Sequence, residues 1–306
     1  MVLLNDLLVC AVCHNELSWI SVETEGRIAC SRCDISYPFS AGVYNMTPLP
    51  LPDENLRSKW DTWEKLQANG LRSYTAAPEF NLSIGNREDA QAFKEFAQAS
   101  GLVLDIGCGP QTRPSYLPES GQCVGMDPLL GQQPRGFSFV QGIGEYLPFR
   151  DGTFDHILYA SSLDHIMNPR NSLAEASRCL KPAGQISLWI DGLASDDPQG
   201  NSSRWERYSM LARKGIKSLS RHNWLSQIGL RRTFSYLGSV ARMEVPEGAS
   251  DYFHFVHLNL EVVSAWLNEL NLITVRQQEF PEADSLFIQV KHGAPATRFG
   301  DQKVEN

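Results

Sequence analysis

The sequence lacks a long apolar segment, a surplus of basic residues and an N-terminal export signal. No apolar run approaches the roughly 18 residues that a membrane-spanning helix needs, so we expect no transmembrane segment. Residues 1–9 are apolar but short, carry Asp6 and contain no Lys or Arg, which is unlike a secretory signal. The 306 residues include 27 basic and 35 acidic ones, a formal net charge of −8. These absences favour a cytoplasmic protein and disfavour broad nucleic-acid binding, which depends on neutralising phosphates.

A disulfide framework is not expected either, because seven cysteines are an odd number in a chain without an export signal. Four of them form two pairs, Cys10-x2-Cys13 and Cys30-x2-Cys33, which sixteen residues separate. This is the spacing of a four-cysteine zinc ribbon, in which each two-residue knuckle turns both thiolates of a pair toward one tetrahedral ion. Four thiolates leave no open coordination position, so such a zinc would be structural. The alternative is a ribbon that has lost its metal.

The remaining three cysteines lie among apolar neighbours, and we expect them to be small buried residues; they are Cys108, Cys123 and Cys179.

Short strands are predicted around the two pairs, at residues 17–22 and 27–29, with a turn at Glu25 and Gly26. The run LLVCAVCHNELSW, followed by IACSRCDISYPFSAGVYNM, resembles the small zinc-ribbon domain of the tRNA-methyltransferase-activator type, which also occurs fused to methyltransferases. The resemblance covers about residues 1–48. It departs from the usual pattern at Ala11, where a proline is common.

The segment after residue 100 carries the most information. Leu102 to Asp105 reads as a short buried strand, and Gly107 and Gly109 follow it, where glycine lets backbone N–H groups approach a ligand closely. A second strand ends in Asp127, 22 residues after Asp105, and an acid at that place can accept both hydroxyls of a ribose. Further strands are predicted at residues 137–141, 156–159, 185–191, 273–280 and 285–292. Helices are predicted at residues 57–67, 87–99, about 162–180 and 258–270. Residues 181–184 are expected to end the third of these helices before the strand that begins at residue 185.

This order of elements, with the motifs DIGCG, LPF and LKPAG, resembles the class I S-adenosylmethionine (SAM) dependent methyltransferases, in particular the broad type 11-like group. The resemblance implies an α/β fold: a Rossmann-like seven-stranded methyltransferase sheet with a small N-terminal zinc ribbon and a helical cap insertion. A dinucleotide dehydrogenase is disfavoured, because Thr112 stands where GxGxxG needs its last glycine. The expected domains are a zinc ribbon at 1–48, a linker and helical segment at 49–84, a methyltransferase domain at 85–292 with a cap at 193–250, and a flexible tail at 293–306.

The same resemblance implies which residues hold SAM. The backbone around Gly107 and Gly109 would hold the methionine part of SAM. Asp127, which ends the second strand, would bind its ribose, and the loop after the third strand would border its adenine. Ile143 stands where many relatives place an adenine-binding Asp, Pro110-Gln111 continues the glycine loop, and Ala183 replaces a glycine. The implied cofactor residues are Asp105, Gly107, Cys108, Gly109, Asp127, Pro128, Gly144, Glu145, Ser161 and Ser162.

Residues 203–243 are strongly basic, with nine Lys or Arg against the single acid Glu206, so this segment is +8 and the rest of the chain −16. Such asymmetry predicts a cap over the acceptor site that holds an anionic group. The alternative is a solvated helical face that pairs with acidic surfaces of the same chain. The basic residues are Arg204, Arg207, Arg213, Lys214, Lys217, Arg221, Arg231, Arg232 and Arg242.

Methyl transfer needs positioning above all, and a base only if the acceptor must lose a proton as it attacks. His165 and Asp164, directly after the fourth strand, and His254, before the last helix, are the candidate catalytic residues. Imidazole titrates near neutrality, which suits this role. The alternatives are that His165 caps a helix or only lines the pocket, that Asp164 is an N-cap, and that His254 is a packing residue.

Three functions remain open. The first is SAM-dependent methylation of an O or N atom of a small-molecule or carrier-linked acceptor, with an anionic acceptor expected from the basic segment. The second is an RNA methyltransferase that uses the ribbon for RNA or partner docking, although residues 1–60 carry four basic and seven acidic residues. The third is a non-catalytic interaction protein on this scaffold. A homodimer is compatible with all three.

Overall fold

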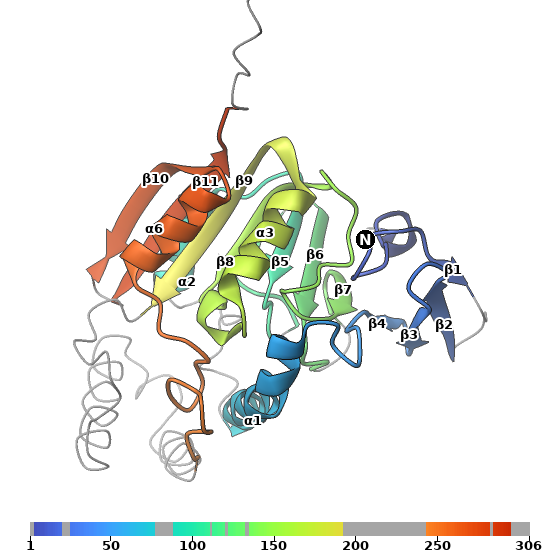
Figure 1. Cartoon of the computed structure of the whole chain (residues 1–306). Helices are drawn as coiled ribbons and strands as arrows, with labels where there is room; N and C mark the ends of the chain where they lie inside the picture. Colours follow the sequence, from blue (N-terminus) through green and yellow to red (C-terminus); the bar gives the residue numbers. More distant parts are fainter. Residues whose placement is uncertain are drawn as a thin grey trace, which may run out of the picture.

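The computed structural model describes residues 3–19, 25–76, 88–110, 112–119, 122–131, 135–191, 243–281 and 284–294. Its strands form one mixed sheet in the order β1-β2-β3-β4-β7-β6-β5-β8-β9-β11-β10 (Figure 1). The N-terminal part of the sheet is an antiparallel meander of β1 (Ser18–Trp19), β2 (Glu25–Cys30), β3 (Ile35–Ser40) and β4 (Val43–Asn45).

The other seven strands form the sheet that the resemblance to methyltransferases implied. Neighbours from β7 to β9 run parallel, whereas β11 is antiparallel to both β9 and β10. The central strands are buried along almost their whole length, as expected where helices cover both faces of a parallel sheet. The bounds are β5 Leu102–Ile106, β6 Gln122–Asp127, β7 Ser138–Gln141, β8 Phe154–Ala160, β9 Leu180–Asp191, β10 Leu272–Phe280 and β11 Ser285–His292.

Helices cover the two faces of this sheet. On one face α2 (Glu88–Ala97) packs Phe93 and Phe96 against Trp189 and Phe287. On the other face lie α3 (Pro169–Cys179) and α6 (Leu260–Glu269), whose apolar side chains share a core with β5, β6 and β8 (Figure 1). The described residues also include the short 3-10 helices η1 (Leu4–Asp6) and η3 (Leu163–His165). Because successive strand residues point to opposite sides of the sheet, each face of the sheet has its own hydrophobic core.

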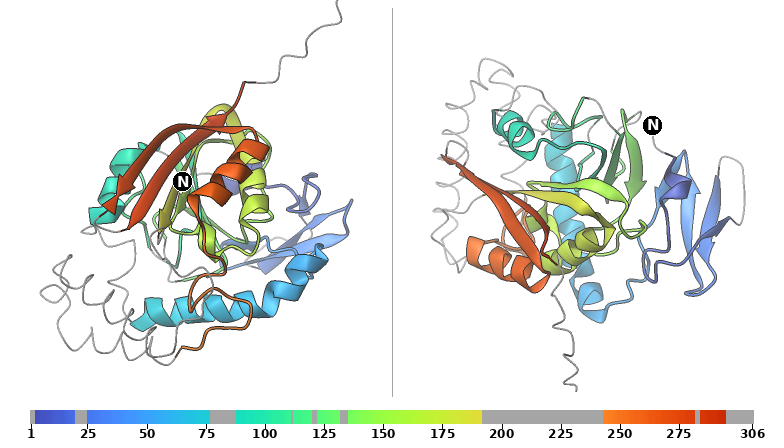
Figure 2. Two further views of the ribbon diagram at one scale, coloured as in Figure 1. Left: turned by 60° about the vertical axis from the view of Figure 1, so that its left-hand side comes forward. Right: turned by 90° about the horizontal axis from the view of Figure 1, so that it is seen from above.

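The longest described helix, α1 (Glu54–Ala76), lies across one end of the central strands (Figure 2). The sequence predicted only residues 57–67. The helix begins earlier because Asp53 Oδ1 accepts the backbone N–H groups of Asn55 and Leu56, at 2.7 and 3.2 Å, as an N-cap does. As predicted, the helix ends before residues 181–184, but these residues are not a separate turn: they belong to β9, which starts at Leu180 directly after α3.

The ribbon and the main body are joined by backbone pairing. β4 pairs in parallel with β7, through Tyr44 with Val140 and Asn45 with Gln141. At the other side of the ribbon, the Val9 N–H donates to the carbonyl oxygen of Pro148 at 2.9 Å. Leu51, in the segment that was expected to be a linker, is buried in one core cluster with Leu56 and Trp63 of α1. The proposed domain boundaries stay a prediction.

Several predictions fall partly or wholly outside the described residues. These are the basic segment with all nine of its Lys and Arg, most of the cap, and the tail from residue 295. Among the helices that are described, none is long and apolar enough to cross a bilayer. Cys108, Cys123 and Cys179 are buried, as predicted.

Candidate functional site

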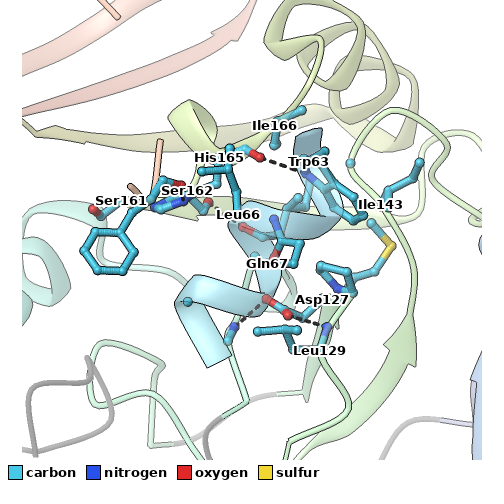
Figure 3. Close-up of a pocket in the computed structure, with 18 of the residues that line it drawn as sticks. Trp63, Leu66, Gln67, Asp127, Leu129, Ile143, Ser161, Ser162, His165 and Ile166 are labelled. Carbon is cyan, nitrogen blue, oxygen red and sulfur yellow. Dashed lines mark hydrogen bonds between the residues drawn. The ribbon is translucent and has the colours of Figure 1, made fainter. Parts of the chain in front are cut away.

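A cavity of about 270 Å³ opens at the carboxyl ends of the parallel strands. Its walls come from the turns after β5, β6, β7 and β8, from α1, and from residues 253–254 (Figure 3). Trp63, Leu66 and Gln67 of α1 face the strand ends across it. In open α/β sheets the crevice outside the carboxyl ends of the strands is where ligands bind.

The turn after β5 presents backbone to the cavity. Gly107 and Gly109 line it, and their φ angles of +78° and +70° are in the left-handed region that favours glycine. A Cβ on Gly107 would lie 2.5 Å from the Cβ of Ser162, so no side chain fits there. The turn is held to β6 because the Gly107 N–H donates to the carbonyl oxygen of Met126 at 2.8 Å. Here, a glycine is required by both conformation and space.

Asp127, at the end of β6, also lines the cavity. Its two carboxylate oxygens accept the backbone N–H groups of Gly109 at 2.7 Å and Leu129 at 2.8 Å. Each oxygen keeps a lone pair, so the group can still accept hydroxyls from a ligand. Burial raises the pKa of Asp127 to about 6. The neighbouring Pro128 forms part of the same wall.

Asp105 and Cys108 lie behind this wall and do not line the cavity, so a part in holding a cofactor stays a prediction for them. Asp105 is fully buried. One of its oxygens accepts the Tyr116 hydroxyl at 2.9 Å, while Oδ1 has no hydrogen-bond partner within the described residues. Burial raises the pKa of Asp105 to about 7. The Tyr116 hydroxyl therefore holds the Asp105 carboxyl inside the core, away from the cavity.

Arg135 is a supporting residue that the sequence did not single out. Its buried guanidinium donates to the carbonyl oxygens of Gly109 at 2.8 Å, Leu129 at 3.1 Å and Leu130 at 2.6 Å. It also lies over the ring of Phe139, 3.7 Å from the centroid. One side chain thus fixes both cavity loops, and no motif in the sequence marks it.

The loop after β7 forms the opposite wall, with Ile143, Gly144 and Glu145. Glu145 is 3% exposed, and its Oε1 accepts the Asn168 N–H at 3.0 Å. Burial raises its pKa to about 7. Ile143 gives this wall an apolar surface at the position where many methyltransferases have an adenine-binding Asp.

Ser161 and Ser162 follow β8 and line the cavity. The Ser161 hydroxyl donates to Asp191 Oδ2 at 2.5 Å, and the Ser162 hydroxyl donates to the Ile106 carbonyl oxygen at 2.6 Å. Because both protons are engaged within the protein, a ligand would meet the two hydroxyls as acceptors.

The three catalytic candidates come together at one end of the cavity. The Nε2 atom of His254 lies 3.5 Å from Asp164 Oδ2, and that of His165 lies 3.8 Å from Asp164 Oδ1. The segment carrying His254 is tied to η3, since the Phe255 and Val256 N–H groups donate to the Asp164 carbonyl oxygen. Asp164 is not a helix N-cap: it lies inside η3, and the N-cap of α3 is Asn168.

Two further residues fix these histidines, and the sequence did not predict either role. Asp251 Oδ2 lies 2.7 Å from His254 Nδ1. Burial alone would lower the pKa of His254, but the carboxylates of Asp164 and Asp251 outweigh this and raise it to about 9. Trp63 of α1 donates its indole N–H to the carbonyl oxygen of His165 at 3.0 Å. Trp63 lies in the helix that the sequence predicted at residues 57–67, but nothing there indicated that this helix would form a wall of the cavity.

The four ribbon cysteines also come together. All four sulfur atoms lie within 4.8 Å of one another, and Cys13 Sγ is 3.5 Å from Cys30 Sγ. Four sulfurs each about 2.3 Å from one tetrahedral ion lie roughly 3.8 Å apart, so the arrangement fits zinc. The two knuckles match: the residues after the pairs, His14 and Asp34, both have positive φ, at 58° and 56°. The backbone thus repeats one turn to present both pairs.

Comparisons with known proteins locate the similarity in the main body. Residues 104–188 match the methyltransferase domain family. An uncharacterised methyltransferase of Schizosaccharomyces pombe is 29% identical over 39% of this chain and 49% of its own length, and one of Bacillus subtilis is 33% identical over 33% and 44%. The chain thus spans about half the length of these relatives. A solved structure of a putative methyltransferase from Bacillus halodurans covers 68% of this chain and 100% of its own, with 15% identity and a TM-score of 0.45.

Proposed function

The chain carries a class I SAM-dependent methyltransferase domain, and we propose that it methylates an O or N atom of a small-molecule or carrier-linked acceptor. The observation that carries this proposal is the cavity itself. It joins the glycine turn and Asp127, which suit the donor, to His165 and His254, which suit an acceptor.

The residues present fit SAM. Asp127 keeps lone pairs for two ribose hydroxyls, and the Gly107 turn has no room for a side chain, which lets a ligand lie against backbone. Among the described residues that line the cavity there is no Lys or Arg, while Asp127 and Glu145 are acidic. Such walls suit a cationic sulfonium and an ammonium group. When bound, SAM supplies a methyl group that its sulfonium has already activated for in-line displacement.

The proposed acceptor end is the Asp164–His165–His254 cluster. His165 Nδ1 lies 2.8 Å from the carbonyl oxygen of Phe253. A carbonyl can only accept, so Nδ1 carries the proton and Nε2 presents its lone pair. His165 can therefore hold or take up an acceptor proton, while Asp164 and His254 orient the acceptor. The basic segment 203–243 supports an anionic acceptor, but it lies outside the described residues.

We further propose that Cys10, Cys13, Cys30 and Cys33 hold a structural zinc. The sulfur geometry supports this, and four thiolates leave the ion no open position for catalysis. Its function would be to fix the knuckles of the meander that pairs with β7 through β4.

Calorimetry with SAM on the full chain tests the donor site. We expect one equivalent to bind, and Asp127→Asn to weaken binding by about ten- to hundredfold, because an amide can accept only through one of its two terminal atoms. The matched control is Asp284→Asn in the β10–β11 turn, where asparagine also tolerates the positive φ of 55°. Absence of binding at high-micromolar SAM would contradict the proposal.

The acceptor class is tested with SAM that carries a radiolabelled methyl group. The full chain is incubated with a small-molecule extract and, separately, with total RNA. We expect label in the small-molecule fraction. Label in RNA alone would instead support the RNA methyltransferase, against which the acidic balance of residues 1–60 already speaks.

A further inference from the structure

The acceptor end of the cavity has too much negative charge for the acceptor that the basic segment predicts. Two carboxyl groups, Asp164 and Asp251, flank His254 there. The imidazolium of His254 offsets one of them, and no Lys or Arg in the described lining offsets the other. An anionic or hydroxyl acceptor would therefore meet repulsion unless another cation lies at this end.

The three side chains have the composition and spacing of metal ligands. One oxygen of Asp164 and one ring nitrogen each of His165 and His254 lie within 4.8 Å of one another. Two imidazoles and one carboxylate form the ligand set that open-sided sites for divalent transition metals use. The His165 and His254 side chains are 37% and 31% exposed, so an ion and a ligand can reach them from the cavity.

Both histidines are also oriented as metal ligands are. The outer nitrogen of each, Nδ1, faces an acceptor: Asp251 Oδ2 at 2.7 Å from His254, and the Phe253 carbonyl oxygen at 2.8 Å from His165. Metal-binding histidines almost always donate their second N–H to a carboxylate or a backbone carbonyl in this way, which turns the other nitrogen toward the ion. Here both Nε2 atoms turn toward Asp164.

The buried carboxyl of Asp164 is a second, independent observation that favours a bound cation. Its side chain is 10% exposed, and Oδ1 has no hydrogen-bond partner in the part of the chain that is described. A buried carboxylate oxygen without a partner is costly, and each such group calls for an explanation such as an ion.

We propose that Asp164, His165 and His254 bind a divalent transition-metal ion whose open positions face the methyl-donor site. This inference rests on the proposed function and narrows the acceptor to molecules that offer the ion an oxygen ligand, such as a hydroxyl or a carboxylate. Two positive charges balance Asp164 and Asp251. The ion displaces the proton from His254 Nε2, since ligating imidazoles are neutral. A hydroxyl that binds the ion has a lowered pKa and can release its proton to solvent, so His165 then serves as a ligand and no longer as the base.

The test is metal binding by the full chain, with Co²⁺ as the probe. The zinc content is measured first, and Co²⁺ is then titrated by calorimetry and by equilibrium dialysis with elemental analysis. We expect one exchangeable Co²⁺ in addition to the zinc of the ribbon. His165→Gln and His254→Gln should each remove the Co²⁺ site and leave the zinc in place. The matched control, His257→Gln, alters an exposed histidine of the same segment and should change neither metal.

Asp251→Asn is a milder second variant, because it alters only the residue that positions His254. Losing such an outer partner should weaken Co²⁺ binding by about ten- to hundredfold while zinc stays bound. The proposal is overturned if the wild-type chain binds no Co²⁺ beyond the ribbon, or if the His165 and His254 variants bind it equally well. SAM calorimetry separates the two failures: a chain that binds SAM but no Co²⁺ loses only this inference.

Discussion

The ribbon cysteines and the Asp164–His165–His254 cluster are both groups of side chains that can bind a metal ion, yet they are built in opposite ways. The cysteines lie within the first 33 residues, on two matching knuckles whose sulfurs face one another. The second cluster joins η3 to a segment far along the chain, and it faces an open cavity. A closed site made from local turns suits structure, whereas an open site assembled by the tertiary fold suits ligands. The spacing of the cysteines predicts the first kind of site from the sequence, whereas no local pattern predicts that the second kind will assemble.

The largest effect is expected from removing one ribbon ligand. Cys30→Ser should abolish stoichiometric zinc and cost several kcal/mol of stability, because structural zinc sites contribute on the order of 10 kcal/mol in isolated ribbons and fingers. Elemental analysis and a thermal melt measure this. Cys123→Ser is the matched control: Cys123 is likewise buried but lies in β6, outside the cluster, so the zinc should remain.

Full zinc occupancy in the Cys30→Ser variant would show that the four cysteines are not the zinc site. The ribbon would then no longer serve as the closed structural site in this comparison. If zinc is lost but SAM still binds, the two regions are independent despite the pairing of β4 with β7.

The difference between the regions also explains what the sequence could predict. The central strands of the body were found because each contains a short apolar run, whereas β10 (LITVRQQEF) is largely polar and exposed and was predicted as half of a terminal hairpin. The turns at Gly107 and Asp127 follow from the local chain. The length of α1 was missed, since its N-cap, Asp53, lies in the segment that was expected to begin with a linker. His254 was named only as a candidate, and nothing local showed that Asp251 and Asp164 would flank it.

The support of the cavity loops was missed for the same reason. Arg135 binds carbonyl groups on two loops that precede it in the chain, and Tyr116 reaches back to Asp105. Hydrogen bonds between side chains and distant backbone leave no periodicity or motif. Their partners are determined by the tertiary packing, so they become visible only when the sheet is assembled.

Two glycines with the same backbone conformation, one in the ribbon and one in the cavity, separate the effect of backbone strain from that of a steric clash. Gly42 in the ribbon and Gly107 in the cavity both have φ of +78°. Alanine at such a φ costs about 1–2 kcal/mol at either place. A Cβ meets nothing within 4 Å at Gly42, but lies 2.5 Å from Ser162 Cβ at Gly107. Gly107→Ala should therefore destabilise the fold further and weaken SAM binding by about a hundredfold, a cost near 2.7 kcal/mol, while Gly42→Ala leaves SAM affinity unchanged.

Thermal melts and SAM calorimetry on both glycine variants give the result. Equal losses of SAM affinity would mean that Gly107 matters only for backbone strain, and that the close approach of the turn to Ser162 has no part in donor binding.

The smallest expected effect concerns charge in the cavity. Burial raises the pKa of Asp127 and Glu145, which line the cavity, to about 6 and 7, and that of Asp105, behind the wall, to about 7. As pH rises through these values the carboxyl groups ionise, so the walls become more negative and attract the sulfonium of SAM more strongly. SAM affinity should increase by about tenfold between pH 5.5 and 8, equivalent to one pKa unit or 1.36 kcal/mol. S-Adenosylhomocysteine lacks the sulfonium and should show a flatter profile.

Stability without ligand should run the other way. A carboxyl whose pKa is raised by folding holds its proton longer in the folded state than in the unfolded chain, so stability falls as pH rises from about 4 to 7. Bound SAM should offset this fall. Glu145→Gln removes one of the three groups, which should flatten both the affinity and the stability profiles. If SAM and S-adenosylhomocysteine show the same pH dependence, the buried carboxyls do not act on the sulfonium, and the acidity of these walls serves the fold alone.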